Sequence, residues 1–177
     1  MKRYQIAILF FALGIFAVTF SFGWFISTVD VEPMPTVAPE YSTIKVFFSN
    51  TNEDPGTLNC GITYPATREI FRLTTNWESR LGELAYLAIR ELLKGPTETE
   101  KSLGFFTSIN TDSNIKTIAI ENGIARVDFN DRFNEGVAGS CKVEAIRSQV
   151  AETLKQFPEI KEVIISVEGD SEETLQP

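Results

Sequence analysis

An uncharged apolar run near the N-terminus limits most strongly what this chain can fold into. Residues 6–26 include no charged side chain, and most of these positions hold Ile, Leu, Phe, Ala or Val. A helix of these 21 residues rises about 31 Å, which matches a bilayer hydrocarbon core of about 30 Å. The run therefore predicts a transmembrane anchor over residues 6–27, preceded by a short cytoplasmic tail, residues 1–5.

The residues that flank this run predict its orientation. Lys2 and Arg3 precede it, whereas Asp30 and Glu32 follow it, so the positive-inside rule places the N-terminus in the cytoplasm. A cleaved signal peptide is one alternative, but its apolar core usually has about 7–15 residues and ends in small side chains. A buried core helix is another. The length of the run favours the retained anchor, and the rest of the chain is then expected on the extracytoplasmic side.

The segment that follows the anchor is rich in proline. Residues 28–43 include Pro33, Pro35 and Pro39 and few large apolar side chains. This composition is typical of a stiff, extended tether rather than of packed structure. We therefore expect one folded domain over residues 44–177.

Charge and composition exclude several classes of function. Histidine is absent, which removes the commonest general base at neutral pH and the commonest metal ligand. Ser/His/Asp catalysis, Cys/His catalysis and histidine zinc sites are therefore excluded. Removing the positive charges of Lys2 and Arg3 from the net −8 leaves −10 for the remainder. A domain this acidic repels phosphate backbones, so we expect no nucleic-acid binding.

The first part of the domain reads as two extended segments and two helices. Residues 44–48 form a β-rich run, and residues 62–72 a second one in which Pro65 favours an edge strand or an irregular crossing. A helix follows the T-x-x-E capping pattern at residues 75–78 and ends at Gly95-Pro96. The same pattern at residues 97–100 predicts a short helix that ends near Leu103.

A β-hairpin is the sharpest local prediction. Asn122-Gly123 suits a two-residue type I′ turn. Since the turn fixes the register outward, three facing pairs are expected: Glu121 with Ile124, Ile120 with Ala125 and Ile118 with Val127.

In the last part of the domain, the pattern of apolar residues predicts one more helix and one more strand. An apolar stripe at helical spacing follows Ser140 and stops at Pro158, and residues 163–167 form a near-continuous apolar run. Such a run is typical of a strand covered on both faces. The order of elements indicates an α+β fold, in which a small mixed sheet carries helices packed on one face.

Cys60 and Cys141 are the two cysteines, and both lie beyond the anchor. An extracytoplasmic setting favours a disulfide between them. The chain-entropy model assigns a loop of about 80 residues roughly 4 kcal/mol of stabilisation. A reactive thiol at Cys141, near a helix N-terminus, is the functional alternative. A zinc site is not expected, because two cysteines alone do not supply enough ligands.

The most concentrated carboxylates follow the predicted hairpin, at Asp128, Asp131 and Glu135, with Asn130 among them. Paired carboxylates could hydrolyse glycans, and carboxylate oxygens could hold calcium. The simpler interpretation, which we favour, is that Asp128 points to solvent and the others lie in a turn. Ser140 lacks a G-x-S-x-G context and is expected to be a helix N-cap. We expect no catalytic, metal-binding or cofactor-binding residues.

Five segments of the domain form a recognisable series: residues 92–101 (LLKGPTETEK), 120–129 (IENGIARVDF), 139–140 (GS), 153–158 (TLKQFP) and 163–169 (VIISVEG). Through these segments, in family order, the domain resembles the GerMN-domain family of bacterial sporulation and germination proteins. The resemblance implies a compact α/β fold akin to ring-building motifs, display outside the membrane, and no catalytic residues.

Three functions remain open at this point. The first is a non-catalytic interaction or assembly module of the cell envelope that self-associates or binds an envelope protein. The second is a module that binds a cell-wall glycan such as peptidoglycan, for which the candidate aromatic residues are Tyr64, Trp77, Phe105 and Phe106; each of these is equally well explained as core. The third is an envelope hydrolase that uses Asp128, Asp131 and Glu135.

Overall fold

The computed structural model describes residues 40–56, 59–72, 77–171 and 174–175. The expected tail and anchor, and all but the last residues of the expected tether, lie outside the described residues. Among the described residues, no helix is both long enough and apolar enough to cross a membrane.

Three strands form a first antiparallel sheet in the order β2-β1-β3. They are β1 (Glu40–Asn50), β2 (Tyr64–Arg72) and the short β3 (Phe105–Phe106). Along β1, Ile44, Val46 and Phe48 are buried, whereas Thr43 and Lys45 between and before them are exposed. This alternation is that of a strand with one face on the core. The edge position predicted for the proline-containing strand is confirmed, because β2 pairs on one side only.

The edge of β1 that faces away from β2 has two kinds of hydrogen-bonding partner. Two residues of β1 pair with β3, and the backbone before them bonds to side chains at the end of a helix. The Gln156 side chain accepts a hydrogen bond from Lys45 N at 2.8 Å and donates one to Lys45 O at 2.6 Å. Phe47 N donates to Thr153 Oγ1 at 3.0 Å. Backbone groups that a sheet edge would leave open are thereby satisfied.

A second sheet has the order β4-β5-β6, with β4 (Ile115–Glu121), β5 (Ile124–Phe129) and β6 (Glu162–Val167). β4 and β5 form the predicted hairpin, and all three expected pairs are confirmed. Asn122 and Gly123 have φ values of 52° and 79°, as a type I′ turn requires. β6 runs parallel to β5 and forms an edge, where residues 163–167 are all partly exposed. The expectation that this strand is covered on both faces was therefore wrong.

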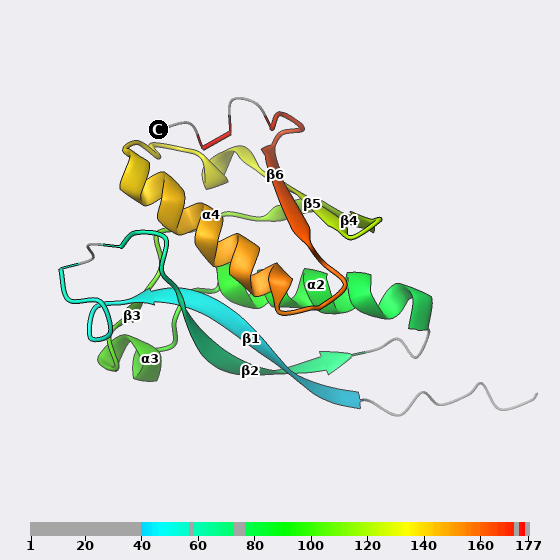
Figure 1. Cartoon of the computed structure of the whole chain (residues 1–177), viewed down its shortest axis with the longest axis horizontal. Coiled ribbons are helices and arrows are strands. Elements are labelled where there is room, and N and C mark those ends of the chain that lie inside the picture. Colours follow the sequence, from blue (N-terminus) through cyan, green and yellow to red (C-terminus); the bar gives the residue numbers. More distant parts are fainter. Residues whose placement is uncertain (1–39, 57–58, 73–76, 172–173, 176–177) are drawn as a thin grey trace, which may run out of the picture. The chain divides into compact units, whose positions relative to one another are not determined.

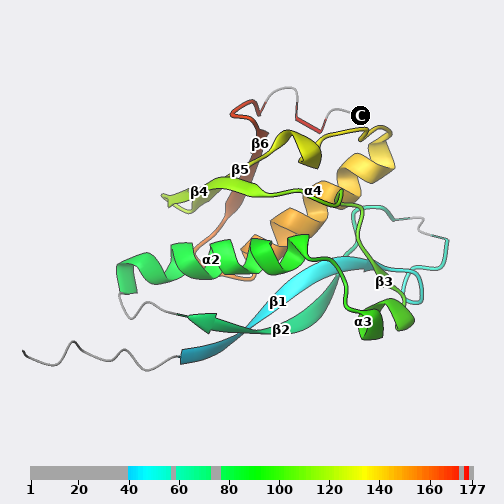
Figure 2. The ribbon, with the colours of Figure 1, turned by 180° about the vertical axis from the view of Figure 1, so that it is seen from behind.

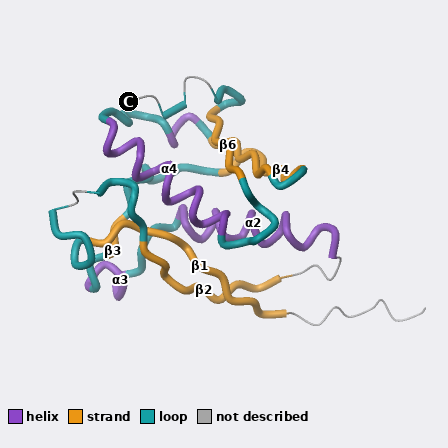
Figure 3. The backbone as a smooth tube through the Cα atoms, viewed as in Figure 1, coloured by secondary structure: helices purple, strands orange, loops and turns teal. Residues whose placement is uncertain are grey.

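The two long helices, α2 (Trp77–Leu93) and α4 (Ser140–Lys155), form a layer between the two sheets (Figure 1; Figure 2). Both helices contact β1 on one side, while α2 reaches β4 and α4 reaches β6 on the other. The α+β class is confirmed, but the single sheet with helices on one face was wrong. The strands form two sheets because β3 and side chains at the end of α4 occupy the edge of β1 with which the hairpin would have had to pair. Figure 3 shows the two groups of strands apart from each other.

Helix ends are only partly as predicted. The start of the T-x-x-E pattern before α2 lies outside the described residues. The short helix α3 (Glu98–Ser102) begins with the predicted capping box between Thr97 and Glu100. α4 differs, because its N-cap is Gly139 with φ 90° and no capping side chain. Ser140 is therefore the first helical residue, not the cap.

One core joins the layers. Its fully buried members include Phe48 of β1, Ile89 of α2, Phe129 of β5 and Ile146 of α4. A 3-10 turn, η1 (Asp131–Phe133), follows β5 and stacks the ring of Phe133 on that of Phe129, with centroids 3.9 Å apart.

Candidate functional site

Asp128, the first of the carboxylates singled out in the sequence, is held by hydrogen bonds within the domain. Its Oδ1 accepts hydrogen bonds from Ser166 Oγ at 2.7 Å and from Gly169 N at 2.8 Å. The side chain is partly buried and ties β5 to β6 and to the turn beyond it. The expectation that Asp128 points to solvent was wrong, because the parallel strand β6 brings donors to this side of the hairpin.

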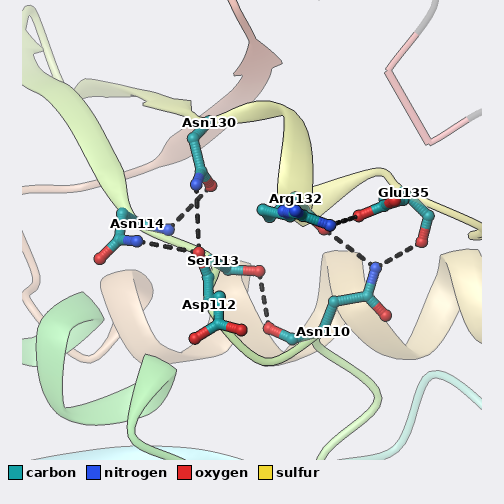
Figure 4. A network of polar contacts seen from close by, with 7 residues as sticks. All are labelled: Asn110, Asp112, Ser113, Asn114, Asn130, Arg132 and Glu135. Atoms are coloured by element: carbon teal, nitrogen blue, oxygen red, sulfur yellow. Dashed lines mark hydrogen bonds and ion pairs between the residues drawn. The ribbon is translucent and has the colours of Figure 1, made fainter.

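The residues after β5 belong to a polar network (Figure 4). Asn130 accepts a hydrogen bond from Asn114 N at 2.9 Å and donates one to Asp112 O at 3.1 Å. These bonds fix the segment before β4 against the end of β5.

Glu135 is held in the same network. Its carboxylate forms an ion pair with Arg132, and its backbone oxygen accepts from Asn110 Nδ2 at 2.6 Å. The Asn110 amide also donates to Arg132 O at 3.0 Å. Asp131 is exposed at the start of η1. Within the described ranges, no three acidic or cysteine side chains gather where they could hold a metal ion. The Asp128 carboxylate thus joins β5 to β6, and the Glu135 carboxylate pairs with Arg132.

A different region has the geometry of a site. A cleft of about 490 Å³, open to solvent, lies between the β1–β2 loop and the N-terminal turn of α4. Cys60 of the loop and Cys141 of α4 both line it and are joined by a disulfide, with Cα atoms 5.1 Å apart and a sequence separation of 81. Since Cys141 is oxidised, it is not the free reactive thiol of the alternative interpretation.

Polar groups from three segments converge on this cleft. Asp54 and Asn59 come from the loop, Ser108 follows β3, and Ser140 begins α4. The side chains of Asn59, Ser108 and Ser140 make no hydrogen bond within the described part of the chain. By contrast, the Asn50 amide at the floor accepts from Asn52 N at 2.8 Å and Glu53 N at 3.3 Å, and donates to Leu103 O at 3.2 Å. The floor is thus fixed, and the rim offers unused hydrogen-bonding groups.

Apolar surface lines the rest of the cleft. Ile62, Phe106, Ala138 and Ala145 contribute to it. Of the four aromatic residues considered for glycan binding, Phe106 lines the cleft and Phe105 packs against the core. Tyr64 lies half-buried at the start of β2, and the side chain of Trp77 lies outside those described.

Sequence reasoning identified Cys60, Cys141, Ser140 and Phe106 but did not bring them into one site. The other contributors, such as Asn59, Ser108 and Ala138, carry no motif. The signal that could have located the cleft is the cysteine pair, because a disulfide places the β1–β2 loop beside the start of α4.

Comparison with known proteins assigns the domain. The Germane family model, described as sporulation and spore germination, matches residues 45–173. No curated protein is similar enough to count as a match.

A solved structure shows a similar fold. The tandem GerMN domains of the sporulation protein GerM from Bacillus subtilis share 20% identity with this chain and superpose with a TM-score of 0.52. The match covers 80% of this chain but 44% of the GerM structure, so the chain spans less than half of that protein's length.

Two further structures have lower TM-scores. The first GerMN domain of the same protein gives 0.44 at 19% identity, covering 73% of this chain and 85% of that one. A candidate lipoprotein from Clostridium perfringens gives 0.48 at 14% identity, covering 81% and 84%. The family model alone spans more than two thirds of the 177 residues. The chain therefore belongs to the Germane family of sporulation and spore-germination proteins, the family of the GerMN domains.

Proposed function

We propose that this protein is a non-catalytic interaction module, held by a single N-terminal helix on the outer face of a bacterial membrane, in an envelope assembly related to sporulation or germination. The observation that carries this proposal is the Germane match over residues 45–173. The sequence supports the membrane attachment through its uncharged run at residues 6–26.

The absence of catalytic activity is supported by the use of the carboxylates. Asp128 accepts hydrogen bonds from β6 and from the turn after it, and Glu135 is paired with Arg132. An acid/base pair for glycan hydrolysis needs two carboxyl groups that face one substrate. The carboxylates of Asp128 and Glu135 bind groups of the protein itself instead.

The edge of β2 that faces away from β1 pairs with no strand among the described residues and is the surface best suited to a protein partner, although Thr67 O on it accepts a hydrogen bond from Arg68 Nη1 at 3.3 Å. Lys45 directs both its N–H and its C=O to α4, so its pairing partner Thr67 turns its own backbone groups away from β1. An edge of this kind can pair with a strand of a second protein. Near one end of the edge, the exposed rings of Tyr41 and Phe71 meet edge-on at 5.7 Å and add apolar contact area.

Topology is tested by protease treatment of intact cells from which the wall has been removed. A C-terminal tag on the full chain should remain in the carbonate-washed membrane fraction and should be lost to external protease. Replacing Lys2 and Arg3 by glutamate should reduce that loss, because it reverses the charge bias that sets orientation. A tag that stays protected in the unaltered protein would exclude display on the outer face.

Partner binding is tested by a photo-crosslinking amino acid placed in native membranes. A cross-linker at Thr67, on the edge of β2, should give a protein adduct that mass spectrometry identifies as another envelope protein or a second copy. The matched control is Lys155, an exposed residue at the C-terminal end of α4. Equal adducts at both positions, or none at Thr67, would argue against β2 as the docking edge.

A glycan-binding module is the second candidate, and one observation favours it. Phe106 contributes to an open cleft whose rim carries unused amide and hydroxyl groups.

A further inference from the structure

We propose that the cleft beside the Cys60–Cys141 disulfide binds an N-acetylated amino sugar of an uncharged glycan. The proposal deepens the second candidate function and rests on display of the domain outside the membrane, where such glycans occur.

The size and form of the cleft suit one sugar residue within a longer chain. Its volume of about 490 Å³ falls within the range of about 300–1,000 Å³ that is typical of small-molecule sites. Because the cleft is open to solvent, a polysaccharide could continue beyond it in both directions. The wall near α4 is low, since Ala138, Gly139 and Ser140 carry small side chains or none.

The lining matches the chemistry of an acetamido group. Such a group presents a methyl, an N–H and a C=O within a few ångströms of one another. Ile62, Phe106 and Ala145 provide apolar surface for the methyl and for a sugar face. The hydroxyls of Ser108 and Ser140 and the amide of Asn59 provide donors and acceptors for the polar atoms.

A buried group adds one further donor. Ser49 at the cleft floor is 7% exposed, and its Oγ accepts a hydrogen bond from Gln149 Nε2 at 3.2 Å. The Ser49 hydroxyl hydrogen remains available to an acceptor in the cleft. Gln149, which is fully buried, fixes the position of this hydroxyl from behind.

Charge favours an uncharged glycan over an anionic polymer. The lining has one acidic side chain, Asp54, and one basic side chain, Lys142, whose Nζ donates to Asn110 Oδ1 at 3.3 Å. These charges offset each other, while the rest of the chain after Arg3 carries −10. A phosphate-rich polymer would therefore be repelled, whereas an uncharged sugar would not.

The disulfide holds one wall of the cleft in place. It joins the β1–β2 loop to α4, and the loop also lies close to α4 at Gly61, where an added Cβ would fall 2.7 Å from Glu144 Oε1. Asn59 directly precedes Cys60, so reduction of the disulfide would release the wall that carries this amide. Sugar binding should therefore depend on the oxidised state.

The test uses the full chain in lipid nanodiscs and saturation-transfer NMR. The probe is triacetylchitotriose, and cellotriose, which lacks acetamido groups, is the control sugar. Transfer to the acetamido methyl protons of triacetylchitotriose should be clear, and transfer to cellotriose should be at background level. Ser140→Trp, which fills the cleft from an exposed position, should weaken triacetylchitotriose binding at least about tenfold. Ala119→Trp, at an exposed position on β4, should leave binding unchanged.

Several results would overturn the proposal. They are the absence of transfer to the unaltered protein, equal transfer to both sugars, unchanged binding in Ser140→Trp, and selective binding of a sugar-free wall peptide at the cleft. A melting temperature for Ser140→Trp equal to that of Ala119→Trp shows that a loss of binding is not a loss of fold. The nanodisc measurement does not depend on orientation in the cell, so its failure would leave the proposed display on the outer face untouched.

Discussion

Arg68 of β2 and Glu100 of α3, 32 residues apart in the sequence, form a two-point pair between guanidinium and carboxylate. Nη2 donates to Oε2 at 2.5 Å, and Nη1 contacts Oε1. The side chains are only 13% and 14% exposed, so most of the pair is removed from water. The same carboxylate accepts from Thr97 N at 2.8 Å, and the Arg68 guanidinium lies 5.9 Å from the centre of the Phe48 ring. One carboxylate thus completes a helix cap and attaches α3 to the first sheet.

Glu100→Gln should lower the free energy of unfolding by about 1–3 kcal/mol, because it leaves the Arg68 guanidinium without its counter-charge in a mostly buried position. Urea denaturation of the purified protein measures this loss. Glu98→Gln is the matched control, since Glu98 is 90% exposed and pairs only with Lys101 on the same helix. Its effect should stay within about 0.5 kcal/mol, and equal losses in the two variants would contradict the role given to the Arg68 contact.

The same pair predicts how stability changes with pH. Burial alone would raise the pKa of Glu100, but hydrogen bonds from Arg68 and Thr97 outweigh it and hold the pKa below its ordinary value of 4.5. A carboxyl whose pKa is lower in the folded state stabilises the fold fully above its unfolded-state pKa. That contribution is lost as the pH falls through the folded-state pKa. Unfolding curves below pH 4.5 should therefore show a loss of stability that is smaller in Glu100→Gln.

Loss of the Cys60–Cys141 disulfide should destabilise the domain by about 2–4 kcal/mol, because the unfolded chain gains conformational freedom. The double variant Cys60→Ser/Cys141→Ser and the reduced unaltered protein should show the same shift in urea midpoint. Adding reductant to the double variant should change nothing, which separates the disulfide from other effects of the reagent. An unaltered protein whose midpoint does not move on complete reduction would refute this prediction.

Gln149 is the most deeply buried polar link between α4 and the first sheet. It accepts from Thr107 Oγ1 at 2.8 Å and donates to Ser49 Oγ. Gln149→Leu should cost about 1–3 kcal/mol, since the partly buried Thr107 hydroxyl loses its acceptor. Thermal unfolding measures the loss, with Glu152→Gln at an exposed position of the same helix as control. A neutral or stabilising result would mean that the two hydroxyls find other partners.

Gln156→Ala should speed hydrogen exchange of the Lys45 amide by about tenfold, which corresponds to the loss of one hydrogen bond. The Phe47 amide, which donates to Thr153 Oγ1, is an internal reference that should change little. Lys155→Ala removes a neighbouring exposed side chain and should alter neither amide. If the Lys45 amide exchanged at an unchanged rate, the helix would not be closing this edge in solution.

Local signals predicted local structure well. The β4–β5 register follows from Asn122-Gly123, because a two-residue turn leaves no freedom in the pairing of its arms. The capping box of α3 and the edge position of β2 depend likewise on a few adjacent residues, such as Thr97 and Pro65.

Non-local features could not be predicted in the same way. Nothing within β1 indicates that Gln156 and Thr153, more than 100 residues later, close its second edge, so the strands were assigned to one sheet instead of two. Asp128 was expected in solvent because the hairpin alone exposes it, and only the parallel strand β6 supplies Ser166. The cleft depends on segments that meet only in the folded domain.

The course of β1 has a mechanical consequence. The strand begins at Glu40, within the last residues of the segment expected as a tether, and ends at Ser49 and Asn50 on the floor of the cleft. If the membrane pulls at Glu40 while a wall polymer is held in the cleft, the tension runs along this single strand. β2 on one side and the Gln156 and Thr153 side chains on the other would then be loaded in shear, so that many hydrogen bonds must break together. The placement of β1 would make this small domain a stiff link between two surfaces that move relative to each other.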